Sequence, residues 1–121
     1  MTLDQLIEEY KSLPQFCDNI NYGDKKAIKK NNASVDRMYQ IVETIRDNFG
    51  NEGVNGLKTL LEVSDHRTNL WIATQLLERI DVDNDTEVKA LEIIRRISSE
   101  NSLLKLGYEI WLKDYMNRTH K

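Results

Sequence analysis

The sequence predicts an all-α protein made of about three helical hairpins, stacked into a right-handed superhelix. Apolar residues recur three and four positions apart along most of the chain, which is the spacing of one helix face. One proline and five glycines in 121 residues leave little room for a turn-rich β architecture. An amphipathic helix cannot bury its apolar stripe alone, so neighbouring helices have to pack on one another. We therefore expect a single helical-repeat domain over residues 1–121.

The first hairpin is expected to pair a short helix with the longest one. An apolar stripe runs over residues 3–17, with a kink or a restart at Pro14, which lacks a backbone donor. The second helix is expected from about Asp24 to Phe49, and the glycines of residues 50–53 end it. Its predicted buried face consists of Val35, Met38, Val42, Ile45 and Phe49.

The second hairpin, over residues 57–80, has the clearest pattern in the chain. The buried face of its first helix is predicted to hold Leu57, Leu60 and Leu61. That of its second helix is predicted to hold Ala73, Leu76, Leu77 and Ile80. Ser64 or Asp65 is expected to accept the free amide protons where the second helix begins.

The third hairpin follows the acidic linker of residues 81–86. Asn84 or Asp85 is expected to cap its first helix, whose inward residues are Ala90, Ile93, Ile94 and Ile97. The last helix, from about Ser102 to Asn117, is apolar on two faces. One face carries Leu103, Leu106, Gly107 and Ile110, and the other carries Leu104, Tyr108, Trp111 and Tyr115. So wide an apolar surface predicts that this helix either sits deep or has a second partner.

Composition and charge narrow the classes of function. The formal net charge of −3 argues against a general nucleic-acid binder, which normally carries a basic excess. The N-terminal residues lack the pattern of a signal peptide, and no run approaches the ~18 apolar residues that a membrane span needs. The single cysteine, Cys17, cannot form an internal disulfide. We expect a cytoplasmic protein.

No pattern in the chain predicts catalysis. It has no Gly-rich phosphate loop and no nucleophile elbow, and Cys17 continues an apolar stripe, which favours a buried thiol over a nucleophile. His66 and His120 have no further histidine or cysteine at ligand spacing. We therefore expect no enzymatic activity, no cofactor and no metal.

One acidic segment partly matches the pattern of a calcium-binding loop. Residues 81–92 place acidic side chains where an EF-hand loop needs them, but Thr86 stands where such a loop has a glycine. The alternative is that the segment begins a helix, whose positive N-terminal end the acidic residues favour. We prefer this second interpretation.

Residues 60–77 resemble a HEAT-repeat hairpin, with Asp65 at the turn, Ala73 inside the second helix and leucines after it. They depart from that pattern at His66, which replaces the usual turn proline, and at Asn69, which replaces the usual arginine. The inter-repeat ladder of arginine and aspartate is therefore not carried over.

The whole chain resembles an uncharacterised family of short bacterial HEAT-like proteins. The segments that carry the resemblance are residues 6–10, 23–24, 30–33, 64–65, 69–77 and 112–115. Members of that family often look like immunity proteins, which neutralise a toxin by binding it. The resemblance thus implies a non-catalytic protein that occludes a cognate bacterial toxin.

The residues expected to contact a protein partner are two tryptophans and an acidic edge, namely Trp71, Trp111, Asp81, Asp83, Asp85 and Glu87. Tryptophans dominate interface hot spots, and an acidic edge speeds association with a basic partner. The alternatives are that the tryptophans fill the core and that the acidic residues provide solubility and helix capping. The competing function is a structural or scaffold protein that associates with itself or docks a cellular partner. A third class, an enzyme or a protein that acts on nucleic acid, is disfavoured by the negative net charge.

Overall fold

The chain is helical throughout the part that the computed structural model describes, residues 1–18 and 23–119. Within these residues there are five α-helices and no strand, which confirms the all-α class. The helices are α1 (Leu3–Ser12), α2 (Lys25–Lys58), α3 (Thr68–Arg79), α4 (Asn84–Glu100) and α5 (Ser102–Thr119). Three 3₁₀ segments join them: η1 (Pro14–Cys17), η2 (Thr59–Glu62) and η3 (Asp65–Arg67). His120 lies outside the described residues.

Within residues 1–18 and 23–119, no helix is both long enough and apolar enough to cross a bilayer.

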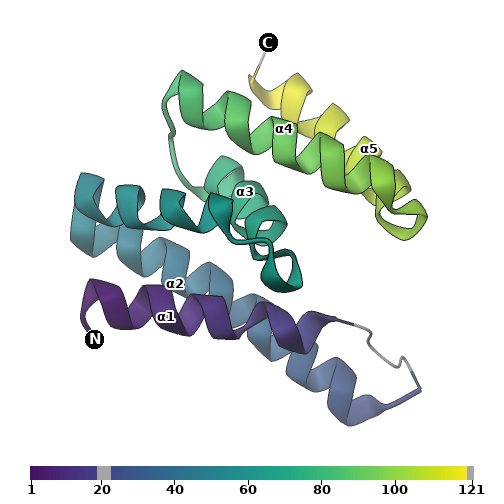
Figure 1. Ribbon diagram of the computed structural model, residues 1–121, viewed down its shortest axis with the longest axis horizontal. Coiled ribbons are helices and arrows are strands. Elements are labelled where there is room, and N and C mark those ends of the chain that lie inside the picture. Colours follow the sequence, from purple (N-terminus) through teal and green to yellow (C-terminus); the bar gives the residue numbers. More distant parts are fainter. Residues whose placement is uncertain (19–22, 120–121) are drawn as a thin grey trace.

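α2 reverses direction at Gly50, whose backbone has φ 54° and ψ −138°. In Figure 1 the chain runs along one arm of α2 to this point and returns along a second arm. The predicted end of the long helix is therefore confirmed as a break in the helix axis, although residues 51–58 stay helical instead of forming a loop. Close packing continues at Gly53, where an added Cβ would lie 2.6 Å from Cγ2 of Ile45.

Most of the predicted core is buried. Met38, Val42 and Ile45 of the first α2 arm and Leu57, Leu60 and Leu61 of the next hairpin are at most 4% exposed. The predictions missed Ile41 and Ile72, both fully buried. They lie off the expected stripes because α2 packs on α1 and also on α3, and α3 packs on α2 and also on α4. A helix with neighbours on two sides buries more than one stripe.

α3 is the most deeply placed helix of the described chain. Every residue from Thr68 to Leu76 except Trp71 is buried, including the polar side chain of Gln75. The hydroxyl of Tyr10 in α1 donates a hydrogen bond of 2.8 Å to Oε1 of Gln75, and both residues are completely buried. Burial raises the pKa of Tyr10 well above its ordinary value, so the phenol remains a donor at neutral pH.

The turn before α3 uses a different cap from the one we expected. His66 and Arg67 have φ of 52° and 58°, and no side chain caps η3 or α3 at its N-cap residue. The prediction that Ser64 or Asp65 caps this helix is therefore wrong. The two left-handed residues turn the chain so that the Asn69 amide donates to the Val63 carbonyl at 2.8 Å. The Asn69 side chain in turn accepts from the amide of Leu70 at 3.0 Å.

α4 and α5 form the last hairpin, and α5 covers α4 with one face only. Tyr115 is 4% exposed, whereas Leu103, Leu106 and Ile110 on the opposite face are 91%, 67% and 57% exposed. Of the two outcomes predicted for this helix, a deep position is therefore wrong. The outer apolar face is open in the described chain.

Replacing Gly50 by alanine should lower the free energy of unfolding by about 1–3 kcal/mol, because a residue with a Cβ is strained at positive φ. Gly107→Ala is the matched control: Gly107 lies inside α5 with no atom within 4 Å of an added Cβ. This control should gain about 0.5–1 kcal/mol from helix propensity. Urea titrations followed by circular dichroism measure both. A Gly50→Ala protein as stable as the unchanged chain would refute the reversal at this residue.

Tyr10→Phe should lower the free energy of unfolding by about 1–3 kcal/mol, because it leaves Oε1 of the buried Gln75 without a donor. The Nε2 atom of Gln75 already has no partner among the described residues, so nothing nearby compensates. Adding Gln75→Met should recover much of this loss, since no polar group is then buried there. The double-mutant cycle is measured by chemical denaturation of the unchanged chain, of Tyr10→Phe and Gln75→Met alone, and of the variant that carries both substitutions. Additive losses would show that these side chains do not interact.

Candidate functional site

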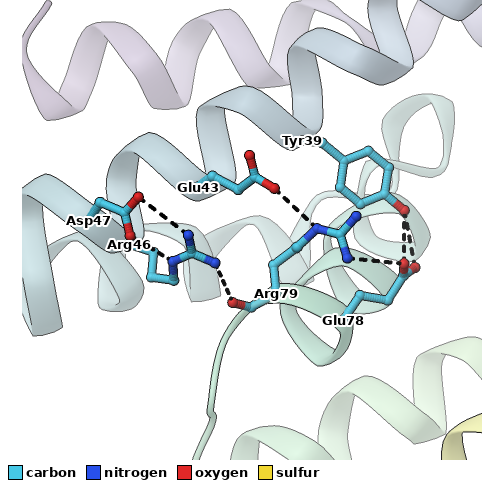
Figure 2. Close-up of polar contacts among 6 residues, drawn as sticks. All are labelled: Tyr39, Glu43, Arg46, Asp47, Glu78 and Arg79. Atoms are coloured by element: carbon cyan, nitrogen blue, oxygen red, sulfur yellow. Dashed lines mark hydrogen bonds and ion pairs between the residues drawn. The ribbon is translucent and has the colours of Figure 1, made fainter.

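A network of polar side chains follows the seam between the first arm of α2 and the end of α3, as Figure 2 shows. We call it the seam network; its members are Tyr39, Glu43, Arg46, Asp47, Glu78 and Arg79. Nε of Arg79 lies 3.2 Å from Oε1 of Glu43, and the guanidinium lies 4.7 Å from the centre of the Tyr39 ring. Arg46 donates to the Arg79 carbonyl at 3.1 Å and to Asp47 at 2.8 Å. These contacts bind the two helices through their side chains and hold both guanidinium groups in place.

Glu78 is the centre of this arrangement. Its two carboxylate oxygens each accept from the Tyr39 hydroxyl at 3.1 Å, and Oε1 also accepts from Nε1 of Trp111 at 3.3 Å. Nη1 of Arg79 lies 3.9 Å away. The side chain is 19% exposed. One carboxylate on α3 therefore links residues of α2, α3 and α5.

Aromatic residues continue the seam network along α5, from the half-buried Tyr108 and Trp111 to the buried Tyr115. The rings of Trp111 and Tyr115 stack with their centres 5.3 Å apart, and Tyr108 meets Trp111 edge-on at 6.1 Å. The Tyr115 hydroxyl donates to Glu87 of α4 at 2.5 Å. We call Tyr108, Trp111 and Tyr115 the aromatic stack. It continues the seam network from Glu78 to Glu87, so that one connected set of side chains crosses four helices.

The phenols of this surface are held in their protonated form. Burial, reinforced by the nearby carboxylate of Glu78, raises the pKa of Tyr39 to about 12. Burial and the Glu87 carboxylate likewise raise the pKa of Tyr115 to about 12. Both hydroxyls therefore remain hydrogen-bond donors at neutral pH, and the geometry that depends on them is stable there.

The structure brings together two of the six predicted contact residues, Trp111 and Glu87, through the aromatic stack. Trp71 lies elsewhere, on α3, half-buried against the core. Asp81 and Asp83 are exposed and line a polar cleft of about 400 Å³ beside the second arm of α2. Asp85 is exposed on the first turn of α4.

The acidic linker forms a helix start and not a calcium loop. Asp83 caps α4 by accepting from the Thr86 amide at 2.7 Å, which corrects the expected cap at Asn84 or Asp85 by one or two residues. The Thr86 bonds, together with Lys58 at 3.2 Å, lower the pKa of Asp83 to about 2. Since α4 is helical from Asn84, the acidic side chains that follow cannot curl around one ion. In the described part of the chain, no three His, Cys, Asp or Glu side chains are grouped to hold a metal.

The cysteine is poorly suited to nucleophilic chemistry. Cys17 is the last residue of η1 and is partly buried, and this burial raises the pKa of its thiol to about 11. At neutral pH the thiol is therefore protonated and a weak nucleophile.

Of the seam network and the aromatic stack, only Trp111 was among the predicted contact residues. The other members, with Glu78 at their centre, were not predicted from the sequence. The spacing of Tyr39, Glu43 and Asp47, four residues apart, marks one helix face. It does not reveal that the partner face is the end of α3.

Searches against protein-family models, curated proteins and solved structures find no significant match to this chain.

Glu78→Ala should lower the free energy of unfolding by about 1–2 kcal/mol, because it removes the shared acceptor of Tyr39 and Trp111. It should also change the emission of Trp111, measured in a Trp71→Phe background where Trp111 is the remaining tryptophan. The control is Glu43→Ala, a more exposed carboxylate in the same network, for which we expect a change within about 0.5 kcal/mol. Equal effects of the two variants would contradict the central position of Glu78.

Proposed function

We propose that this chain is a non-catalytic protein-binding module of the immunity type, which neutralises a cognate bacterial toxin by covering its active or entry site. The proposal draws on the resemblance to short HEAT-like bacterial proteins and on the surface made by the seam network and the aromatic stack. On this view the helical hairpins form a HEAT-like stack in a cytoplasmic protein that needs no cofactor.

The observation that carries the proposal is the fixed presentation of Tyr39, Arg79 and Trp111 around Glu78. Tryptophan, tyrosine and arginine are the residue types most enriched in interface hot spots. Here Tyr39 and Trp111 are partly buried and Arg79 is exposed, and hydrogen bonds, ring stacking and a cation–π contact already hold the three side chains in place. A surface ordered before binding loses less side-chain entropy on association, which favours tight binding.

The acidic edge adds an electrostatic preference. Asp81 and Asp85 are exposed, Asp83 is exposed beside the cleft, and Glu87 connects the edge to the aromatic stack. A negative edge raises the rate at which a positively charged partner arrives. A basic toxin, such as one that acts on nucleic acid, fits this surface better than an acidic one.

The test is neutralisation in cells. An immunity protein is expected to be encoded beside a larger toxin-like reading frame, and the product of such a frame, expressed with and without this chain, is the toxin to test. The unchanged protein should restore growth, whereas Trp111→Ala and Arg79→Ala should each weaken binding at least about tenfold. Lys26→Ala, an exposed position at the start of α2, is the control and should leave binding unchanged.

Binding of the purified proteins separates a lost contact from lost folding. Circular dichroism should show that each variant remains helical, and titration calorimetry should show the weaker affinity. The pair Asp81→Asn and Asp85→Asn should slow association and reduce its dependence on salt. Failure of the chain to bind or neutralise the neighbouring product would reject the immunity function and leave the scaffold alternative.

A further inference from the structure

A polar cleft of about 400 Å³ lies between the second arm of α2 and the linker that joins α3 to α4. One wall consists of residues 81–83 of the linker, and the other carries Asn51, Val54, Asn55 and Lys58 of the second arm. Nζ of Lys58 lies 3.2 Å from Oδ2 of Asp83, so an ion pair joins the two walls. No member of the seam network or of the aromatic stack lines this cleft.

Two asparagine side chains of the helical wall are free to bind a ligand. Asn51 and Asn55 are exposed, and neither side chain has a hydrogen-bond partner within residues 1–18 and 23–119. Residues four apart share one face of a helix and are separated by a rise of about 6 Å. Each carboxamide both donates and accepts hydrogen bonds, as a peptide unit does. The pair can therefore bind the N–H and C=O groups of a second chain at two points about 6 Å apart.

An extended peptide has a matching repeat. Successive residues of a strand advance by about 3.3 Å, so every second residue advances by about 6.6 Å and presents its N–H and C=O groups on the same side. A helical ligand has few such groups to offer, because its N–H and C=O groups bond to one another. The spacing of the two asparagines therefore favours an extended peptide over a helix.

The opposite wall is itself extended backbone. Ile80 has φ −127° and ψ 139°, and Asp83 has φ −69° and ψ 166°. Between them, Asp81 and Val82 make no backbone–backbone hydrogen bond with the part of the chain that the structure describes. An extended segment with free N–H and C=O groups is the feature to which another strand adds. Both walls can therefore bond to the main chain of a peptide.

The charge of the cleft selects the side chains of that peptide. Asp83 is paired with Lys58, whereas the exposed Asp81 has no ion-pair partner among the described residues. Two carboxylates and one ammonium group leave the lining with one net negative charge. A lysine or arginine of the peptide can pair with Asp81, and an acidic residue is repelled. Val54 and Val82, both half-buried, give the cleft an apolar part that suits an aliphatic neighbour.

We infer that this cleft binds an extended peptide segment in which basic and aliphatic residues alternate. Asn51, Asn55 and the linker hold the main chain of the peptide, and Asp81 holds a basic side chain. The inference rests on the proposed function in one respect, since it names the kind of segment that the acidic edge would take from a basic toxin. Synthetic peptides can replace the toxin in its test, because the seam network and the aromatic stack are not part of the cleft.

The test is a titration of the nitrogen-15-labelled chain with a capped hexapeptide of alternating valine and arginine, followed by nuclear magnetic resonance. We expect a dissociation constant between about 10 µM and 1 mM. The signals that shift should belong to residues 51–58 and 80–83, and should include the side-chain amides of Asn51 and Asn55. The double variant Asn51→Ala, Asn55→Ala should bind at least about tenfold more weakly, because it removes both carboxamides. Asp81→Asn should bind about threefold more weakly.

Asn117→Ala is the matched control, an exposed asparagine of α5 outside the cleft, and should bind the peptide as the unchanged chain does. Circular dichroism should show that every variant remains helical, since the substituted side chains are all exposed.

Two further peptides separate main-chain recognition from simple charge attraction. A hexapeptide of alternating valine and glutamate should bind at least about tenfold more weakly than the valine–arginine peptide. A valine–arginine peptide that is N-methylated at its central residues keeps its charges but loses main-chain donors, and should weaken to a similar degree. No binding up to 1 mM, normal binding by the double variant, or equal binding of either control peptide would overturn the inference. Failure to neutralise a toxin in cells would reject the immunity function and leave these peptide results unchanged.

Discussion

The position of α3 is the constraint on which the rest of the structure depends. Nearly all of its first nine residues are buried, so it has to be enclosed by α2, η2 and α4 at once. The polar residues of α3 also have partners on other helices. Gln75 accepts a hydrogen bond from the Tyr10 hydroxyl of α1, and the Thr74 hydroxyl lies 2.9 Å from the Tyr108 hydroxyl of α5. A helix buried this completely gains its stability from packing more than from its own propensity. The reversal at Gly50 allows the two arms of α2 to lie beside it (Figure 1).

The same constraint explains how the candidate binding surface is formed. Glu78 lies at the end of α3, just beyond its buried part, where it can reach Tyr39 on one side and Trp111 on the other. The aromatic stack and the seam network thus both contact the most buried helix of the described chain through Glu78. This arrangement suits the proposed binding function, because a partner would meet a surface whose internal contacts are already made. The outer face of α5 lies farther from α3 and has no such support.

The sequence predicted the helical class, the order of the helices and most of the core, because each apolar stripe is a local pattern. It did not predict that α3 is buried on nearly all sides, since the spacing of Ala73, Leu76 and Leu77 is that of a one-sided helix. The turn before α3 was predicted, but the left-handed backbone of His66 and Arg67 within it was not, because residues other than glycine rarely adopt positive φ. Glu78 and Tyr39 are far apart in sequence, and no local pattern pairs them. The acidic linker was ambiguous because capping and calcium binding use the same residue types.

Native-state hydrogen exchange measures directly whether α3 is the helix that holds the others together. The buried amides of α3, from Ala73 to Leu76, should exchange only when the whole chain unfolds, with a free energy equal to that of global unfolding. Those of α5 should exchange at a lower free energy through local opening. If the α3 amides exchange by local opening while α4 or α5 stays protected, the central position assigned to α3 is incorrect.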